Sequence, residues 1–266
     1  MGFYDAWKSQ EHVQLFDIWS RVPLFVLRDR FERFNEVRLL NAWTEDRKAS
    51  FSLLEIGCAT GEFYRYFAAR HPNASYVGCD ISEVAIRRAQ EKCPATGRFV
   101  HTDENLSAVT GLKPDVVFCR DVLLHQPDPF AFLQRLYGLT QHTLVLRLRT
   151  RDVGATELDP EKSCQLNYGA WAPYIVVNAQ ELLRAIQGFS PRPRRIHLVK
   201  HYMVLGGQHA RFLPKDCYYP ETGTAESALL IEKGDENASC AVTEEACPEN
   251  LRLGLVAGAV ARFCRG

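Results

Sequence analysis

The chain has 266 residues, of which 46% are hydrophobic and 24% charged, so it can bury a sizeable core and is not globally disordered. Its 32 Lys and Arg balance its 32 Asp and Glu, and this balance gives no support for a nucleic-acid partner. No apolar run reaches the roughly 18 residues of a membrane span, and the first residues lack the apolar core of a secretory signal. We therefore expect a cytoplasmic protein with no membrane partner, and we leave its oligomeric state open, with a homodimer as one alternative.

The nine cysteines include no CxxC pair. Cys58, Cys79 and Cys119 fall in predicted strands or at their ends, which is typical of reduced, buried thiols. No Cys and His cluster has metal-ligand spacing, so we expect neither a disulfide framework nor a metal site.

Residues 1–45 are predicted to be helical, because aromatic side chains recur among charged residues, with an interruption at Pro23. This N-terminal addition is either a layer packed on the core or a lid over a ligand pocket, and its periodicity does not distinguish the two.

Residues 46–235 are expected to form one α/β domain, because short apolar runs alternate there with helical patterns. The predicted strands are 51–56, 75–79, 97–101, 115–119, 143–148, 195–206 and 226–232, and the predicted helices are 62–71, 82–93 and 128–138. The last two strands have no helix between them, which predicts an antiparallel hairpin beside an otherwise parallel sheet. Residues 236–266 are expected to be a linker followed by a short C-terminal helix.

A glycine-rich turn follows the first strand of this domain. Glu55 ends the strand, and Gly57-Cys58-Ala59-Thr60-Gly61 leads into the first helix. Glycines allow the backbone to turn tightly and to approach a ligand closely. The turn lacks the G-x-G-x-x-G pattern of dinucleotide sites, and Glu55 and Glu62 would repel a diphosphate. An acid before the turn suits a ligand that carries an ammonium or sulfonium group.

The segment from Glu55 to Gly61 resembles motif I of class I S-adenosylmethionine (SAM)-dependent methyltransferases, with Ala59 in place of the middle glycine. Three further segments support the resemblance in the same order, and together they cover residues 50–150. They are YVGCDIS, RFVHTDENL and the run PDVVFCRDVLLHQPDPFAFL. The resemblance implies a Rossmann-like sheet of seven strands, mostly parallel, with helices on both faces.

The resemblance also implies the cofactor, SAM, and its contacts. Asp80, 19 positions after Gly61, would accept the ribose hydroxyls. Asp103 would meet the adenine or, as an alternative, only cap a helix. The full set of predicted cofactor-binding residues is Glu55, Gly57, Cys58, Ala59, Gly61, Asp80, Ile81, Asp103, Glu104 and Arg120.

His125 is the predicted catalytic residue, because an imidazole can take a proton from an acceptor hydroxyl as the methyl group transfers. The alternative is that His125 packs beside the cofactor and has only a structural hydrogen bond. Tyr168 and Trp171 are predicted to line the acceptor pocket, with packing of a loop on the core as the alternative.

Arg147, Arg149 and Arg151 alternate along the fifth strand, so they share one side of it. At the carboxyl end of that strand they would hold an acidic group of the acceptor, and Arg147 and Arg149 are therefore predicted substrate-binding residues. The alternative is a local set of ion pairs with Asp152, Glu157 or Asp159.

We therefore expect a SAM-dependent methyltransferase that acts on a small-molecule acceptor by O-methylation. Two alternatives remain. One is a non-catalytic partner protein that binds SAM, and the other is a nicotinamide-dependent oxidoreductase. Binding of SAM or of NADH would discriminate them.

Overall fold

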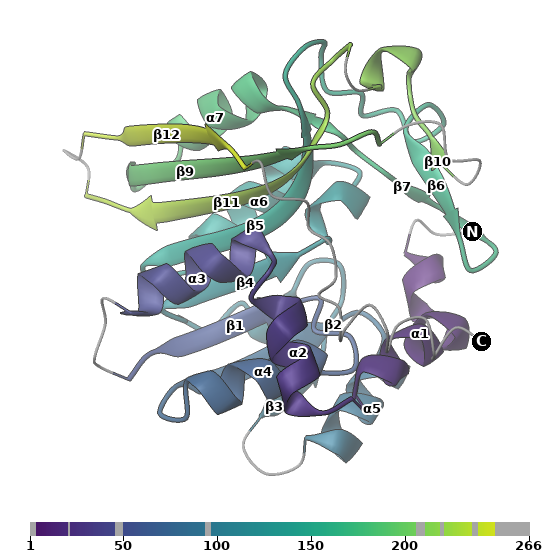
Figure 1. The fold of residues 1–266 in the computed structure, drawn as a ribbon, viewed down its shortest axis with the longest axis vertical. Coiled ribbons are helices and arrows are strands. Elements are labelled where there is room, and N and C mark those ends of the chain that lie inside the picture. Colours follow the sequence, from purple (N-terminus) through teal and green to yellow (C-terminus); the bar gives the residue numbers. More distant parts are fainter. Residues whose placement is uncertain are drawn as a thin grey trace.

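A single twisted sheet forms the centre of the molecule (Figure 1). The computed structural model describes residues 4–20, 22–45, 50–93, 97–205, 211–218, 221–235 and 239–247. Within them the strand order is β12-β9-β11-β5-β4-β1-β2-β3, and β8 pairs with β5. The strands are β1 (Ser52–Ile56), β2 (Ser75–Asp80), β3 (Arg98–His101), β4 (Val116–Arg120), β5 (Thr143–Arg151), β8 (Val177–Asn178), β9 (Pro193–Tyr202), β11 (Ala225–Lys233) and β12 (Ala241–Ala246).

Strands β1 to β5 are parallel to one another, whereas β11 runs antiparallel to both β5 and β9. The predicted seven strands and the antiparallel hairpin are therefore confirmed, and β12 and β8 extend the sheet. Because the sheet is covered on both faces, the central strand β4 is apolar on both faces as far as Arg120. Along β4, Val116 and Phe118 pack on one face, and Val117 and Cys119 pack on the other.

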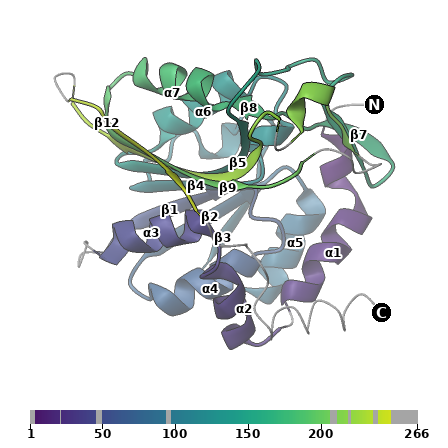
Figure 2. The same cartoon turned by 45° about the horizontal axis from the view of Figure 1, so that its top comes forward.

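Helices cover both faces of the sheet (Figure 2). On one face lie α6 (Pro129–Leu139) and α7 (Ala179–Gln187), and on the other lie α4 (Glu62–Arg70) and α5 (Glu83–Lys92). Ser82, Asp128 and Asn178 cap α5, α6 and α7 by accepting backbone N–H groups of the first turn. Each cap therefore fixes the residue at which its helix begins.

The N-terminal helices form a layer on the face that carries α4 and α5. They are η1 (Asp5–Lys8), α1 (Gln10–Ser20), α2 (Leu24–Phe31) and α3 (Asn35–Glu45). Leu27 and Phe31 of α2 and Val37 and Leu40 of α3 are fully buried in the core on this face. Helices α2 and α3 are therefore a packed layer, which is one of the two predicted roles.

A small antiparallel sheet lies beyond the carboxyl end of β5. It consists of β6 (Cys164–Asn167), β7 (Ala170–Pro173) and β10 (Arg211–Phe212). Residues of η1 contact β7, so the start of the chain and this sheet lie side by side. Short 3-10 turns are found at η2 (Ser107–Val109), η3 (Leu123–His125) and η4 (Lys215–Cys217).

The predicted linker is wrong for residues 241–246, which form β12 in parallel with β9. All six residues of β12 are exposed. Its sequence therefore needs no alternation of apolar and polar residues, and it has none from which a strand could be predicted. Backbone pairing and the Lys200–Glu244 ion pair (2.8 Å) hold it instead. The predicted C-terminal helix lies outside the described residues, and no helix among the described residues has the length and apolarity to span a membrane.

Candidate active site

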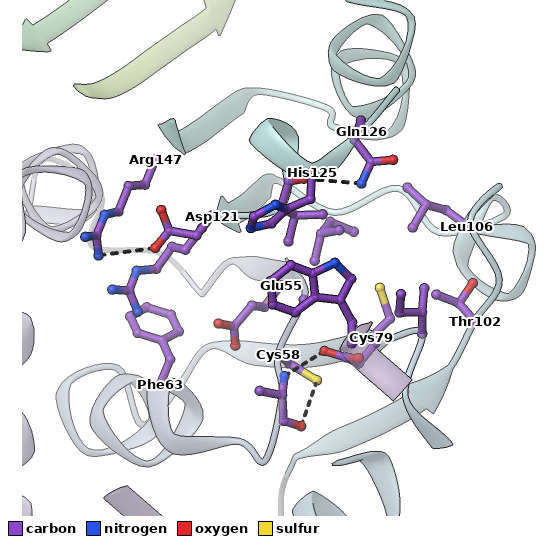
Figure 3. A pocket seen from close by; sticks show the side chains of 18 of the residues that line it. Glu55, Cys58, Phe63, Cys79, Thr102, Leu106, Asp121, His125, Gln126 and Arg147 are labelled. Carbon is purple, nitrogen blue, oxygen red and sulfur yellow. Dashed lines mark hydrogen bonds and ion pairs between the residues drawn. The ribbon is translucent and has the colours of Figure 1, made fainter. Parts of the chain in front are cut away.

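A cavity of about 480 Å³ opens at the carboxyl ends of the central parallel strands. Such crevices at the strand ends of open α/β sheets are where ligands bind. Figure 3 shows that its side chains come from several neighbouring elements, among them Glu55 on β1, Cys79 on β2, Thr102 after β3, Asp121 after β4 and Arg147 on β5. From the strands and their turns, the lining residues are Glu55, Gly57, Cys58, Ala59, Cys79, Asp80, Ile81, Thr102, Asp103, Glu104, Leu106, Arg120, Asp121, Val122, His125, Gln126 and Arg147.

The glycine turn after β1 adopts a conformation that L side chains rarely take. Gly57, Ala59 and Gly61 have φ angles of 77°, 46° and 80°. A Cβ atom at Gly57 would overlap Cγ2 of Val122, so this position needs glycine for space as well as for its backbone. The turn itself is fixed by N–H groups of Gly57 and Cys58, which donate to the carbonyl of Cys79.

The carboxylate of Asp80, at the end of β2, is tied to the same turn. It accepts the N–H of Ala59 at 2.9 Å and the N–H of Ser82 at 2.8 Å. Burial raises the pKa of Asp80, and these backbone hydrogen bonds lower it in opposition. Asp80 therefore fixes the turn and still lines the cavity, where it can accept hydrogen bonds from a ligand.

Glu55 is a buried acid in the floor of the cavity, and it is only 3% exposed. The hydroxyl of Tyr76 donates a hydrogen bond to its carboxylate. Burial raises the pKa of Glu55 to about 8, although the Tyr76 hydrogen bond lowers it. An entering cation would favour the ionised form of this carboxyl.

At the end near β3, Asp103 has a local role. Its carboxylate accepts the N–H groups of Asn105 and Ser107 and the hydroxyl of Ser107, and these bonds lower its pKa. The capping alternative is therefore present in the structure, and Asp103 and Glu104 also line the cavity.

His125 lies in η3 and is 8% exposed at the cavity wall. Its Nδ1 lies 2.8 Å from the carbonyl oxygen of Pro173, so Nδ1 carries a proton and donates it. In the neutral ring, Nε2 is then the basic atom. The ring of Trp7 packs on the imidazole, with ring centroids 4.3 Å apart.

Three arginines and three carboxylates form a continuous ion-pair network at the ends of β4, β5 and β11. Arg120 donates to Glu36 at 2.8 Å. Arg147 pairs with Glu226 at 2.7 Å and with Asp121 at 3.4 Å, and Arg149 pairs with the same two carboxylates, each at 3.0 Å. Glu36 comes from α3, so the N-terminal layer takes part in the network.

Four residues of the sequence prediction lie outside the cavity lining. They are the predicted acceptor contacts Tyr168, Trp171 and Arg149, and Arg151 on the same side of β5. The ring of Trp171 is 47% exposed and packs on Phe212, and Arg149 is enclosed in the network. The rings of Tyr168 and Trp7 meet edge-on with their centroids 6.3 Å apart, and Trp7 in turn packs on His125. Arg151 is buried on Asp216 at 2.6 Å, so its partner and those of Arg147 and Arg149 differ from the acids predicted.

The N-terminal segment contributes lining residues that the sequence analysis did not single out. They are Tyr4, Trp7, Trp19, Arg30 and Phe34. The recurring aromatic residues of 1–45 and the alternative of a lid both indicated that aromatic rings could lie at the cavity. No sequence pattern indicated Arg30. The segment thus packs through α2 and α3, and residues of η1, α1 and α2 also border the cavity, while its role as a lid stays a prediction.

Arg30 differs from the other arginines of the cavity. Its guanidinium stacks over Trp19 at 3.9 Å, and its Nη1 is buried without a hydrogen-bond partner among the described residues. Burial lowers the pKa of Arg30 to about 10.

Within the described ranges, no three His, Cys, Asp or Glu side chains gather as a metal site would require.

Comparison with known families agrees with this geometry. Residues 54–143 match a family model described as a methyltransferase domain. A tRNA (guanine-N(7)-)-methyltransferase of Chloroflexus aggregans is 33% identical over 115 residues, which are 42% of this chain and 47% of that protein. A trans-aconitate 2-methyltransferase of Variovorax paradoxus is 29% identical over 100 residues, 38% of each chain. The chain thus matches less than half the length of these curated relatives.

Solved structures share the fold at low sequence identity. Magnesium protoporphyrin IX methyltransferase from Synechocystis PCC 6803, solved with bound SAM, has a TM-score of 0.50 at 19% identity and covers 86% of this chain and 94% of its own. The plantazolicin methyltransferase BpumL, in complex with S-adenosylhomocysteine (SAH), has a TM-score of 0.52 at 17% identity and covers 87% and 93%.

The motif, the strand order and the family match agree with one another. Residues 54–143 therefore resemble a methyltransferase domain, and the chain has the Rossmann-like fold that the sequence predicts.

Proposed function

We propose that this protein transfers the methyl group of SAM to a small-molecule acceptor, at an oxygen atom. The observation that carries the proposal is the glycine turn of β1, fixed to the Asp80 carboxylate at the edge of a cavity of about 480 Å³. That volume lies in the range of small-molecule sites, which is about 300–1,000 Å³.

The polarity of the cavity matches the groups of SAM from one end to the other. Asp80 would accept hydrogen bonds from the ribose hydroxyls, with the adenine toward Thr102 and Leu106. Glu55 would favour the cationic end of the cofactor. Arg30 would bind the carboxylate of the methionine moiety, because its Nη1 has no partner among the described residues. The other proposed cofactor contacts line the cavity, and they are Gly57, Cys58, Ala59, Ile81, Asp103, Glu104 and Arg120. Gly61 lies outside the lining and shapes the turn.

Methyl transfer is a displacement at the methyl carbon. The bond from carbon to the acceptor oxygen forms, the bond from carbon to sulfur breaks, and SAH leaves. Since the sulfonium is already reactive, the protein mainly contributes proximity and alignment. A hydroxyl acceptor also loses a proton, and His125 would take it at Nε2, since Nδ1 is engaged by Pro173.

The curated relatives include enzymes named for tRNA and for trans-aconitate. We favour a small molecule over tRNA, because a phosphate backbone is bound by excess positive charge and this chain has a formal net charge of zero. The aromatic rings of Trp7, Trp19 and Phe34 at the cavity suit a compact organic acceptor.

Calorimetry with SAH, and with NADH for comparison, tests the cofactor half of the proposal. We expect SAH to bind and NADH not to bind. A coupled assay of SAH release from SAM, with a set of small phenols and alcohols, then tests methyl transfer. Absence of SAH binding would refute the cofactor proposal, whereas tight SAH binding without turnover on any acceptor would favour a non-catalytic partner protein.

A further inference from the structure

The strand order places the two reactants on different strands. The proposed adenosine contacts lie at β1, β2 and β3, and β4 and β5 follow β1 on the other side. A SAM molecule with its ribose at Asp80 therefore directs its sulfonium toward the end of β4. The first residue after β4 is Asp121, and it lines the cavity.

Asp121 lines the cavity together with Arg120 and Arg147, and it is the most exposed member of the ion-pair network. Its side chain is 38% exposed, whereas those of Arg120, Arg147 and Arg149 are 13%, 12% and 11% exposed. Glu36 and Glu226 are 2% and 9% exposed. Figure 3 shows the Asp121 carboxylate beside Arg147, with His125 on its other side.

The backbone of Asp121 is held in an unusual conformation. Its φ is 54°, in the left-handed region, and its N–H donates to the carbonyl of Arg147 at 3.2 Å. Left-handed conformations of non-glycine residues cluster at functional sites, where surrounding structure maintains them. The neighbouring arginines supply that structure, since Arg147 and Arg149 each hold one carboxylate oxygen.

The arginines do not offer an equivalent site for an anion. The network contains three guanidinium groups and three carboxylates, and every guanidinium in it has a carboxylate partner. An acidic acceptor would either displace one of these partners and leave a buried carboxylate unpaired, or bind at the unpartnered Nε atoms of Arg147 and Arg149 beside carboxylates that repel it.

We propose that the carboxylate of Asp121, held from behind by Arg147 and Arg149, binds the hydrogen-bond donor of the methyl acceptor. The acceptor then carries a hydroxyl or an amine at the reacting position, and it is not an acid bound through the arginines. This inference rests on the proposed function, because it requires SAM in the cavity.

The charge state of Asp121 agrees with this role. Burial would raise its pKa, but Arg147, Arg149 and Arg120 lower it well below its ordinary value, and His125 acts in the same direction. Asp121 is therefore a permanent anion near neutral pH, which orients a donor and stabilises the imidazolium that forms when His125 takes a proton.

Sinefungin is the probe for this inference, because it carries a protonated amine where SAM carries its methyl group, whereas SAH carries nothing there. We expect the wild-type protein to bind sinefungin about tenfold to a hundredfold more tightly than SAH, the range of a charged hydrogen bond. In Asp121→Asn this preference should fall at least tenfold, with the affinity for SAH changed less than threefold. Asp128→Asn, which keeps the cap of α6 outside the cavity, should leave both affinities unchanged.

The outcomes separate this inference from the proposed function. Failure of both ligands to bind the wild type refutes SAM binding itself. Binding of SAH without a preference for sinefungin, or a preference that survives in Asp121→Asn, overturns the role of Asp121. An equal loss of both affinities in the variant would show that Asp121 has a structural role only.

A pH series on the wild type gives an answer even if the variant does not fold. If Asp121 binds the amine, the preference for sinefungin should be flat between pH 6.5 and 8. If Glu55 binds it, the preference should rise about tenfold over that range, because the pKa of Glu55 is about 8. A rise of that kind would overturn the assignment to Asp121.

Discussion

The two halves of the cavity are held in place by different means. At β1 and β2, backbone groups fix the site, since the N–H of Ala59 binds Asp80 and the N–H groups of Gly57 and Cys58 bind the carbonyl of Cys79. At β4 and β5, side-chain charges fix it, and they come from α3, β4, β5 and β11.

This difference determines how each half of the cavity should respond to amino-acid substitutions. The half at β1 and β2, where we propose that SAM binds, must fit one molecule, and its fit depends on a backbone path that only a few residues allow. The acceptor half can be altered by exchanging side chains on separate elements without disturbing the turn. Perturbing the first half should therefore abolish binding, whereas perturbing the second half should change turnover or selectivity.

Gly57→Val is expected to have the largest effect. The side chain would collide with Val122 and would require a φ of 77° from a β-branched residue, so SAM and SAH binding should be lost. Calorimetry with SAH measures this loss. Gly111→Ala is the matched control, because no atom lies within 4 Å of a Cβ placed there. Normal SAH binding by Gly57→Val would contradict the assignment of the turn.

His125→Ala should mainly affect chemistry. Loss of a general base lowers turnover about 10²- to 10⁴-fold, and SAH affinity should stay within a few-fold of the wild type. His142→Ala, at a half-exposed histidine just before the amino end of β5 and away from the cavity, should retain full turnover. A lower melting temperature with little change in turnover would instead assign His125 a packing role.

Asp80→Ala should weaken SAM binding by an intermediate amount. A charged hydrogen bond contributes about 1.5–3 kcal/mol, which corresponds to roughly a 10- to 150-fold loss of affinity. Asp80→Asn should lose less, because its amide oxygen can still accept the N–H of Ala59. Equal SAH affinity in the wild type and a folded Asp80→Ala variant would exclude the ribose contact.

The cavity wall at β1 and β2, our proposed cofactor half, could be predicted from the sequence because its determinants are local. Glu55, Gly57 and Gly61 lie within one strand-to-helix turn, and Asp80 ends the next strand. The strand runs and the antiparallel hairpin are likewise apparent from apolar patterns, whereas the exposed strand β12 has no such pattern.

The acceptor half could not be predicted in the same way. Alternation correctly placed Arg147 and Arg149 on one side of β5, but their partners Asp121 and Glu226 come from other strands. Pairing across a sheet depends on strand order and register, which short sequence patterns do not specify. A free guanidinium and a neutralised one therefore look the same in the sequence.

Glu55→Gln should produce the smallest effect, on the stability of the unliganded protein. The folded-state pKa of Glu55 is about 8, above its ordinary value of 4.5, so the folded state holds a proton that the unfolded state has released. Between these values stability falls as pH rises, by up to about 1.4 kcal/mol per pH unit for one proton. Burial lowers the pKa of His71 to about 4, with the opposite sign, and that contribution to the pH slope fades above about pH 6.5 and is common to the wild type and the variant.

The difference between the melting curves of the wild type and Glu55→Gln at pH 6.5, 7.25 and 8 therefore isolates Glu55. Each kcal/mol shifts the melting temperature by about 2–4 °C in a protein of this size. The wild type should lose melting temperature across this range, and Glu55→Gln should lose less. Burial also raises the pKa values of Glu62 and Asp80, so part of the slope should remain in the variant. Identical slopes in the two proteins would mean that Glu55 is already ionised in the folded state, and the cavity floor would then hold a fixed negative charge before SAM binds.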